Sequence, residues 1–64
     1  MFGWTYLDGT GDEVGRSHGF PDADAAEDWI GSSWQDLFEN GVEAVVLFDL
    51  DRGQRVYRMG LGTE

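Results

Sequence analysis

The side chains that could act in catalysis are few, and their spacing forms no catalytic arrangement. The chain of 64 residues contains one histidine, His18, and no cysteine. Ser17 precedes this histidine, but consecutive strand residues point to opposite faces, so the two side chains cannot form a nucleophile–base pair. Glu27 and Asp28 are adjacent carboxylates on an acidic surface, where no apolar pocket would raise a pKa for acid catalysis. We therefore expect a protein that is not an enzyme; a pH-sensing or partner-contacting role for His18 is a separate alternative.

The segment after residue 48 resembles a calcium-binding loop only in part. Asp49 and Asp51 have the alternating spacing of calcium ligands, and Gly53 follows them. In an EF-hand loop the glycine stands one position later, and the twelfth position is a bidentate glutamate. Gly60 occupies that twelfth position here. The sequence therefore predicts no calcium site.

The first glycine-rich turn combines carboxylates with two glycines. Asp8, Asp12 and Glu13 could together hold a divalent ion, but carboxylates in turns are mostly solvated. Gly9 and Gly11 precede a strand, whereas glycine loops that bind phosphate lead into a helix. We expect no metal ion, nucleotide or other cofactor.

The length of the chain limits its stability. A single domain of this size buries only about 60% of the surface that its unfolded chain exposes. Without cysteines or a Cys/His cluster, it has neither disulfides nor structural zinc to compensate. We therefore expect it to gain stability by associating with itself or with a partner. No apolar run approaches the roughly 18 residues of a membrane span, and the N-terminus lacks a signal-peptide pattern, so a soluble cytoplasmic protein is expected.

The charge of the chain is strongly negative and unevenly distributed. Thirteen acidic residues and four arginines, with no lysine, give a net charge of −9. Residues 1–40 carry nine acids and one arginine (−8), and residues 41–64 carry four acids and three arginines (−1). Such a field disfavours contact with nucleic acid or anionic membranes and favours basic partners. Alternatively, the acidity serves only solubility or reflects a salt-adapted or GC-rich host.

One amphipathic helix is predicted over residues 22–40. Ala26, Ile30 and Leu37 share one narrow apolar sector, flanked by Trp29 and Trp34. The helix starts at Asp22 or Asp24, either of which can cap its N-terminus, and it stops at Asn40-Gly41. The opposite, acidic surface comprises Asp24, Asp28, Asp36 and Glu39. Gly31 costs about 1 kcal/mol in the helix interior; it either lets a neighbour approach closely or is simply tolerated.

Four strands are predicted around this helix, over residues 2–8, 13–20, 42–50 and 54–61. Alternating or apolar residues rich in aromatic and β-branched types define them, and glycine-containing turns separate the members of each pair. The glycines of the second strand favour a bulge. The order predicts one α+β domain of ββαββ type, with a mainly antiparallel four-stranded sheet and the helix on one face. The order of the strands within the sheet is left open.

A single helix can cover only one face of such a sheet, although the strands carry apolar residues on both. We therefore expect the uncovered face or the strand edges to bind a partner protein or a second copy of the chain. Aromatic residues and arginine contribute most to such interfaces. The predicted partner-binding residues are Trp4, Tyr6, Phe48, Tyr57, Arg55 and Arg58.

The spacing of turn and core residues resembles that of a group of bacterial proteins. The residues that carry the resemblance are Trp4-x-Tyr6-Leu7, Gly11-x-Glu13-Val14, Ser17, Phe20-Pro21-Asp22, Ala25-Ala26, Trp29, Gly41-Val42-Glu43-x-Val45-Val46 and Tyr57-Arg58-Met59-Gly60-Leu61. The chain resembles short uncharacterised acidic proteins of actinobacteria and, more loosely, small bacterial domains built as two hairpins around a helix. The resemblance implies the fold and no activity.

These observations favour a non-catalytic protein-interaction module or accessory subunit. An acidic inhibitor that imitates nucleic acid is the first alternative, with the helix carboxylates, Asp12 and Glu13 presented to a basic groove. A small-ligand-binding protein or an enzyme is the second.

Overall fold

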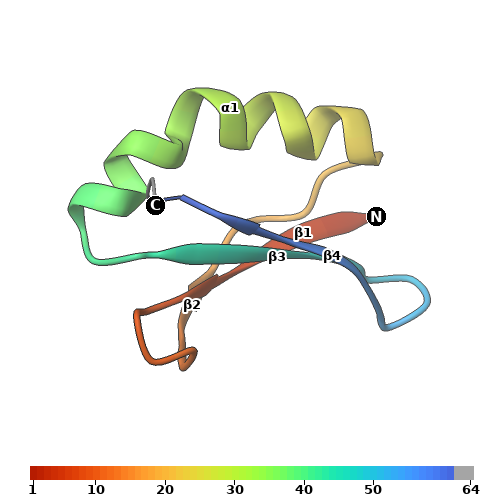
Figure 1. The fold of residues 1–64 in the computed structure, drawn as a ribbon. Helices are drawn as coiled ribbons and strands as arrows, with labels where there is room; N and C mark the ends of the chain where they lie inside the picture. Colours follow the sequence, from red (N-terminus) through yellow and green to blue (C-terminus); the bar gives the residue numbers. More distant parts are fainter. Residues whose placement is uncertain (62–64) are drawn as a thin grey trace.

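A computed structural model describes residues 1–61 and shows one helix packed on one face of a four-stranded sheet (Figure 1). The elements are β1 (Phe2–Leu7), β2 (Glu13–Arg16), α1 (Ala23–Glu39), β3 (Ala44–Asp49) and β4 (Gln54–Gly60). The predicted α+β class and ββαββ order are confirmed. Within these residues, α1 is not long and apolar enough to cross a membrane.

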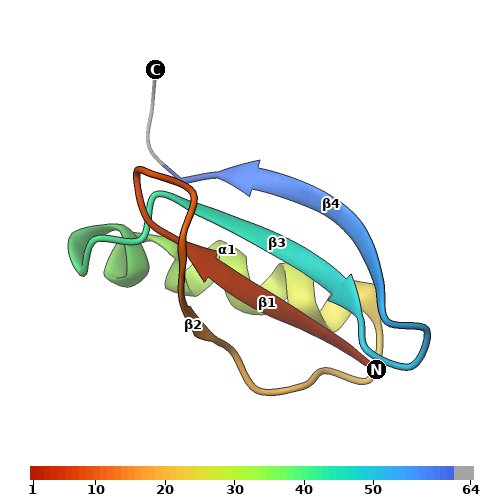
Figure 2. The ribbon, with the colours of Figure 1, turned by 90° about the horizontal axis from the view of Figure 1, so that it is seen from below.

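The strand order is β2-β1-β3-β4, and every pairing is antiparallel. The two hairpins therefore meet through β1 and β3, which form the centre of the sheet, and β2 and β4 form its edges (Figure 2). The chain returns from β2 to β3 through α1, which crosses over β1.

Both ends of α1 are fixed by local hydrogen bonds that the sequence indicates. Asp22 is the N-cap, and its carboxylate accepts a hydrogen bond from the Ala25 amide at 2.8 Å. At the other end, Gly41 adopts a φ of 94°, in the left-handed region that glycine tolerates. The amide of Val42 donates to the carbonyl of Leu37 at 3.0 Å, which completes a Schellman-type C-terminus.

The second predicted strand, 13–20, is too long. The ladder of β2 ends at Arg16, because the amide of Trp4 donates to the side-chain hydroxyl of Ser17 at 2.9 Å instead of to a backbone carbonyl. The chain rejoins the sheet only at Phe20, which forms an isolated bridge with Phe2. The expected bulge is present, since the β1–β2 register shifts between Tyr6 and Leu7. The other predicted boundaries lie within two residues of those observed.

The core lies between α1 and the sheet and is centred on Trp4. This residue is 1% exposed, and its indole Nε1 donates to the main-chain carbonyl of Ala26 at 2.8 Å. The other buried members of the core are Phe20, Ala26, Ile30, Val42, Val45, Leu47 and Leu61. A buried indole N–H without an acceptor would cost about 1–3 kcal/mol, so this bond fixes where the helix lies on the sheet.

We expect Trp4→Phe to lower the free energy of unfolding by about 1–3 kcal/mol, because it removes both ring volume and the bond to Ala26. The matched control is Trp34→Phe, since Trp34 is 41% exposed and its replacement should cost less than about 1 kcal/mol. Urea unfolding, monitored by far-ultraviolet circular dichroism, measures the free energy of unfolding of both variants. Equal losses in the two variants would show that Trp4 does not hold the helix.

Candidate functional site

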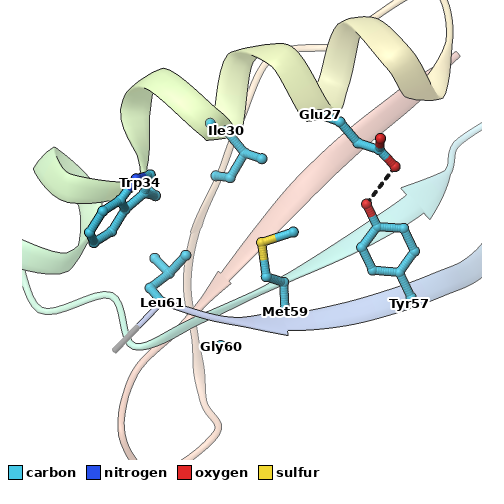
Figure 3. Close-up of a pocket in the computed structure, with 8 residues that line it drawn as sticks. Glu27, Ile30, Trp34, Tyr57, Met59, Gly60 and Leu61 are labelled. Carbon is cyan, nitrogen blue, oxygen red and sulfur yellow. Dashed lines mark hydrogen bonds between the residues drawn. The ribbon is translucent and has the colours of Figure 1, made fainter. Parts of the chain in front are cut away.

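A cleft with a volume of about 590 Å³ lies between α1 and the edge strand β4 (Figure 3). Its lining comprises Glu27, Ile30, Gly31 and Trp34 from the helix, Tyr57, Met59 and Gly60 from β4, and Leu61. Most of this lining is apolar, and two polar side chains stand at one end. We refer to it as the α1–β4 cleft.

The α1–β4 cleft exists because the helix packs close to β1 and diverges from β4. Among the strands of residues 1–61, only β1 brings Cα atoms within 8 Å of those of the helix. Gly31 widens the space further, since a Cβ built at this position would meet no heavy atom within 4 Å. The hollow is therefore produced jointly by the placement of the helix and by one missing side chain.

The helix and β4 run in the same direction along the cleft, so its two ends differ in character. At one end Glu27 faces Tyr57, and at the other Trp34 lies beside Leu61 (Figure 3). Ile30 and Met59 line the middle. The cleft is thus polar and acidic at the N-terminal half of the helix and apolar at its C-terminal half.

The polar end is held together by one hydrogen bond. The hydroxyl of Tyr57 donates to Oε2 of Glu27 at 2.7 Å. Burial, followed by this hydrogen bond and the negative charge of Glu27, raises the pKa of Tyr57 to about 12. The phenol therefore stays protonated at neutral pH and acts as a hydrogen-bond donor, not as a base.

The apolar end offers aromatic surface to solvent. Trp34 is 41% exposed, and Phe38, one helical turn further on, is 43% exposed. Residues four apart lie on the same side of a helix, so both rings belong to the flank of α1 that borders the cleft. Exposed rings next to a cavity are typical of surfaces that bind protein.

The outer edge of β4 lies beside the cleft. Among the described strands, β4 pairs only with β3, so its other edge has no strand beside it. An unpaired edge presents amide and carbonyl groups that can bond to an added strand. Cleft and edge therefore adjoin each other on the same side of the molecule.

Three of the predicted partner-binding residues, Trp4, Tyr6 and Tyr57, lie on the face of the sheet that α1 covers and not on the uncovered face. The registers pair Trp4 with Leu47 and Leu47 with Tyr57, and these residues all lie on the face that α1 covers. Directly paired residues share a face, and the larger apolar set of β1 is the one that packs under the helix. Trp4 is buried and cannot contact a partner, whereas Tyr57 is half-buried and lines the cleft.

The other predicted partner-binding residues are Phe48, Arg55 and Arg58, and they lie on the open face, the face of the sheet that α1 does not cover. Phe48 pairs with Arg55, and Val46 pairs with Arg58. Val46 is only 6% exposed although no helix covers it, which fits the ability of arginine stems to cover apolar neighbours. The open face is therefore shielded in part by its own side chains.

A smaller hollow of about 270 Å³ marks the open face beside β2. Its lining includes Thr5, Ser17 and Phe48, together with Glu13 and Arg16. Nε of Arg16 donates to Glu13 at 2.5 Å, and this pair lowers the pKa of Glu13 and raises that of Arg16. Both charges are thus already satisfied within the chain.

The predicted acidic surface is divided between two places. Asp24, Asp28, Asp36 and Glu39 are exposed on α1. Asp12 and Glu13 lie instead in the β1–β2 hairpin, which projects on the side of the sheet away from the helix (Figure 1). The structure does not bring these two groups of carboxylates together.

The candidate chemical groups have other roles in the fold. The hydroxyl of Ser17 donates to the backbone carbonyl of His18, and the imidazole packs against Phe20 with 4.4 Å between ring centroids and a tilt of 48°. Asp8 accepts hydrogen bonds from the hydroxyl and amide of Thr10, which lower the pKa of its carboxyl. Within residues 1–61, no three His, Asp or Glu side chains are arranged to hold a metal ion.

Sequence reasoning missed Gly31, Trp34, Met59 and Leu61 as site residues. Two signals were present, a glycine in a helix interior and a tryptophan at the flank of the apolar sector. Neither shows which strand that flank faces, because this depends on the strand order and on how closely the helix approaches each strand.

No protein-family model, curated protein or solved structure matches the chain. The function is therefore argued from the geometry of the site.

We expect the Tyr57–Glu27 pair to make stability depend on alkaline pH. The pKa of Tyr57 is raised in the folded state from 10.0 to about 12, so its contribution is complete below pH 10 and is lost as the pH rises towards 12. Denaturant unfolding across this range should show the decline, and Tyr57→Phe should reduce it. Burial also raises the pKa of Tyr6, so Tyr6 accounts for part of the decline in stability that remains in Tyr57→Phe. An unchanged pH profile in Tyr57→Phe would contradict the assignment.

Proposed function

We propose that this chain is a small non-catalytic protein-interaction module that binds an extended segment of a partner protein along β4 and in the α1–β4 cleft. The observation that carries the proposal is the position of an apolar cleft directly beside a strand edge to which no described strand is bonded. Either feature alone is common, and together they form the two halves of a peptide-binding site.

The free edge would supply affinity that does not depend on sequence. A partner segment added to β4 forms backbone hydrogen bonds and places alternate side chains on the two faces of the sheet. Side chains on the helix side enter the cleft, which accounts for specificity. This is the recognition mode of domains that bind peptides by strand addition.

The cleft would supply the side-chain contacts. Its volume of about 590 Å³ suits a few side chains of a bound segment or one small molecule. Trp34 offers a large apolar surface at low entropic cost, a property of residues that dominate binding energies. The free edge beside the cleft favours a peptide over an isolated small ligand, because a small ligand would leave that edge unused.

The acidic helix surface supports a second candidate, an inhibitor of a basic partner. None of Asp24, Asp28, Asp36 and Glu39 forms an ion pair within residues 1–61. The four carboxylates spread over a broad arc of the helix, as a surface facing a basic groove would require.

We expect Gly31→Gln to separate binding from folding. Glutamine is a better helix former than glycine, so the free energy of unfolding should rise by about 0.5–1 kcal/mol. The peptides for this test are linear and are selected from a displayed random library for binding to the unmodified protein. The glutamine side chain extends from the wall of the cleft and should weaken their binding by about tenfold or more. Ser32→Gln, on the adjacent solvent-facing position, is the matched control and should bind normally.

Two results would contradict the proposed site. Selected peptides that bind Gly31→Gln as tightly as the unmodified protein would place the interaction elsewhere. Peptide-induced changes in amide chemical shifts confined to the open face, around Phe48 and Arg58, would do the same. A concentration-dependent dimer whose interface already occupies β4 would assign the edge to a second copy of the chain.

The inhibitor function has its own test in salt. Binding to a polycationic probe such as heptalysine should fall steeply between about 0.05 and 0.5 M salt if the helix carboxylates act together, because screening shortens the range of their field. Replacing Asp24, Asp28, Asp36 and Glu39 by their amides should abolish that binding. A weak response to both changes would exclude this candidate.

A further inference from the structure

The charges around the α1–β4 cleft are of one sign. Glu27 lies at its polar end, and Asp24 precedes it by one turn on the same flank of the helix. The two arginines of β4 point the other way, since Arg55 and Arg58 pair with Phe48 and Val46 on the open face. The polar end of the cleft therefore presents negative charge without a cation from β4.

The carboxylate of Glu27 is oriented but not saturated. Only its Oε2 accepts the bond from Tyr57, and a carboxylate can accept further bonds on both oxygens. The phenol holds the group towards β4 and away from the outer surface of the helix (Figure 3). A cation that enters this end of the cleft would meet a solvent-accessible carboxylate that Tyr57 already holds in position.

We infer that the segment bound in the α1–β4 cleft carries a lysine or arginine at the Glu27 end and a large apolar side chain at the Trp34 end. The inference rests on the proposed function and specifies the chemistry of the partner. The cation meets Glu27, and the apolar side chain packs between Trp34 and Leu61. The occupant is thus a cationic extended peptide, which the net charge of −9 also attracts.

The spacing within β4 sets the distance between these two side chains. Tyr57, Met59 and Leu61 are spaced by two residues and lie on the same face, so the polar and apolar ends of the cleft are four residues apart. An added strand has the same repeat, which corresponds to about 13 Å over four residues. The matching segment therefore has the pattern apolar-x-apolar-x-basic or its reverse.

The direction of the segment follows from the pairing preference of the sheet. Every described pairing is antiparallel, and antiparallel edges form slightly stronger ladders. A segment antiparallel to β4 passes Leu61 first and Tyr57 last. The apolar side chain therefore precedes the basic one in the partner sequence.

Terminally blocked synthetic peptides test this order of residues. The probe is Ser-Leu-Thr-Val-Thr-Lys-Ser, and its controls carry Glu in place of Lys or have the sequence reversed. By fluorescence anisotropy, the probe should bind about fivefold to tenfold more tightly than the Glu peptide at low salt, the range expected for one partly exposed pair plus the repulsion it replaces. The reversed peptide, which has the same charge, should bind more weakly than the probe.

Two charge-removing variants separate a local contact from the overall field. Glu27→Gln keeps a hydrogen-bonding partner for Tyr57 and should abolish the preference for Lys over Glu. Asp36→Asn removes the same charge from the opposite flank of the helix and should preserve that preference.

The outcomes distinguish the inference from the proposed function. Binding of the Lys and Glu peptides with equal affinity, or a preference that survives in Glu27→Gln, would overturn the inference while cleft-dependent peptide binding persists. If no peptide binds in a Gly31-dependent manner, both the proposed function and the inference fail.

Discussion

The hydrogen bond between the Trp4 indole and the Ala26 carbonyl is the constraint on which the arrangement of the molecule depends. The indole is 1% exposed and lies on β1, a central strand. Since its N–H must be paired when it is buried, the helix is held over β1. The edge strand β4 is then left further from the helix. The same contact that fixes the core therefore opens the cleft at its margin.

Local signals in the sequence were sufficient for the elements but not for their faces. The helix ends follow from short-range chemistry at Asp22 and Gly41. Gly41 was predicted, and Asp22 was one of two predicted N-cap candidates. The face that β1 presents to the helix is decided by cross-strand pairing, and β3 is apolar on both faces, so its pattern could not settle the choice. The pattern therefore did not show that Trp4 and Tyr57 lie on the face that α1 covers. The early end of β2 depends on a side-chain acceptor, Ser17, which periodicity does not detect.

The site was less predictable than the fold, because it is made by separation between elements. Met59 and Leu61 look like ordinary strand residues, and only the distance between helix and β4 makes them part of a cleft. The charge pattern follows a similar logic. Arg58 alternates with Tyr57 and Met59, and the register shift between Leu47 and Phe48 pairs Arg55 with Phe48. Both arginines of β4 therefore lie on the open face, and neither lines the cleft. The composition of the sequence gives the net charge, whereas the strand register determines that the arginines of β4 and the carboxylate of Glu27 lie on different faces.

Gly31 connects the stability of the domain with its proposed use. Glycine in a helix interior costs about 1 kcal/mol relative to alanine, and a domain of this size has roughly 3–10 kcal/mol in total. Packing does not require the glycine, since an added Cβ would contact nothing within 4 Å and its φ lies outside the left-handed region. A larger side chain would instead project into the cleft. The domain has no disulfides to offset this cost. The structural feature that a glycine at position 31 preserves is the open cleft.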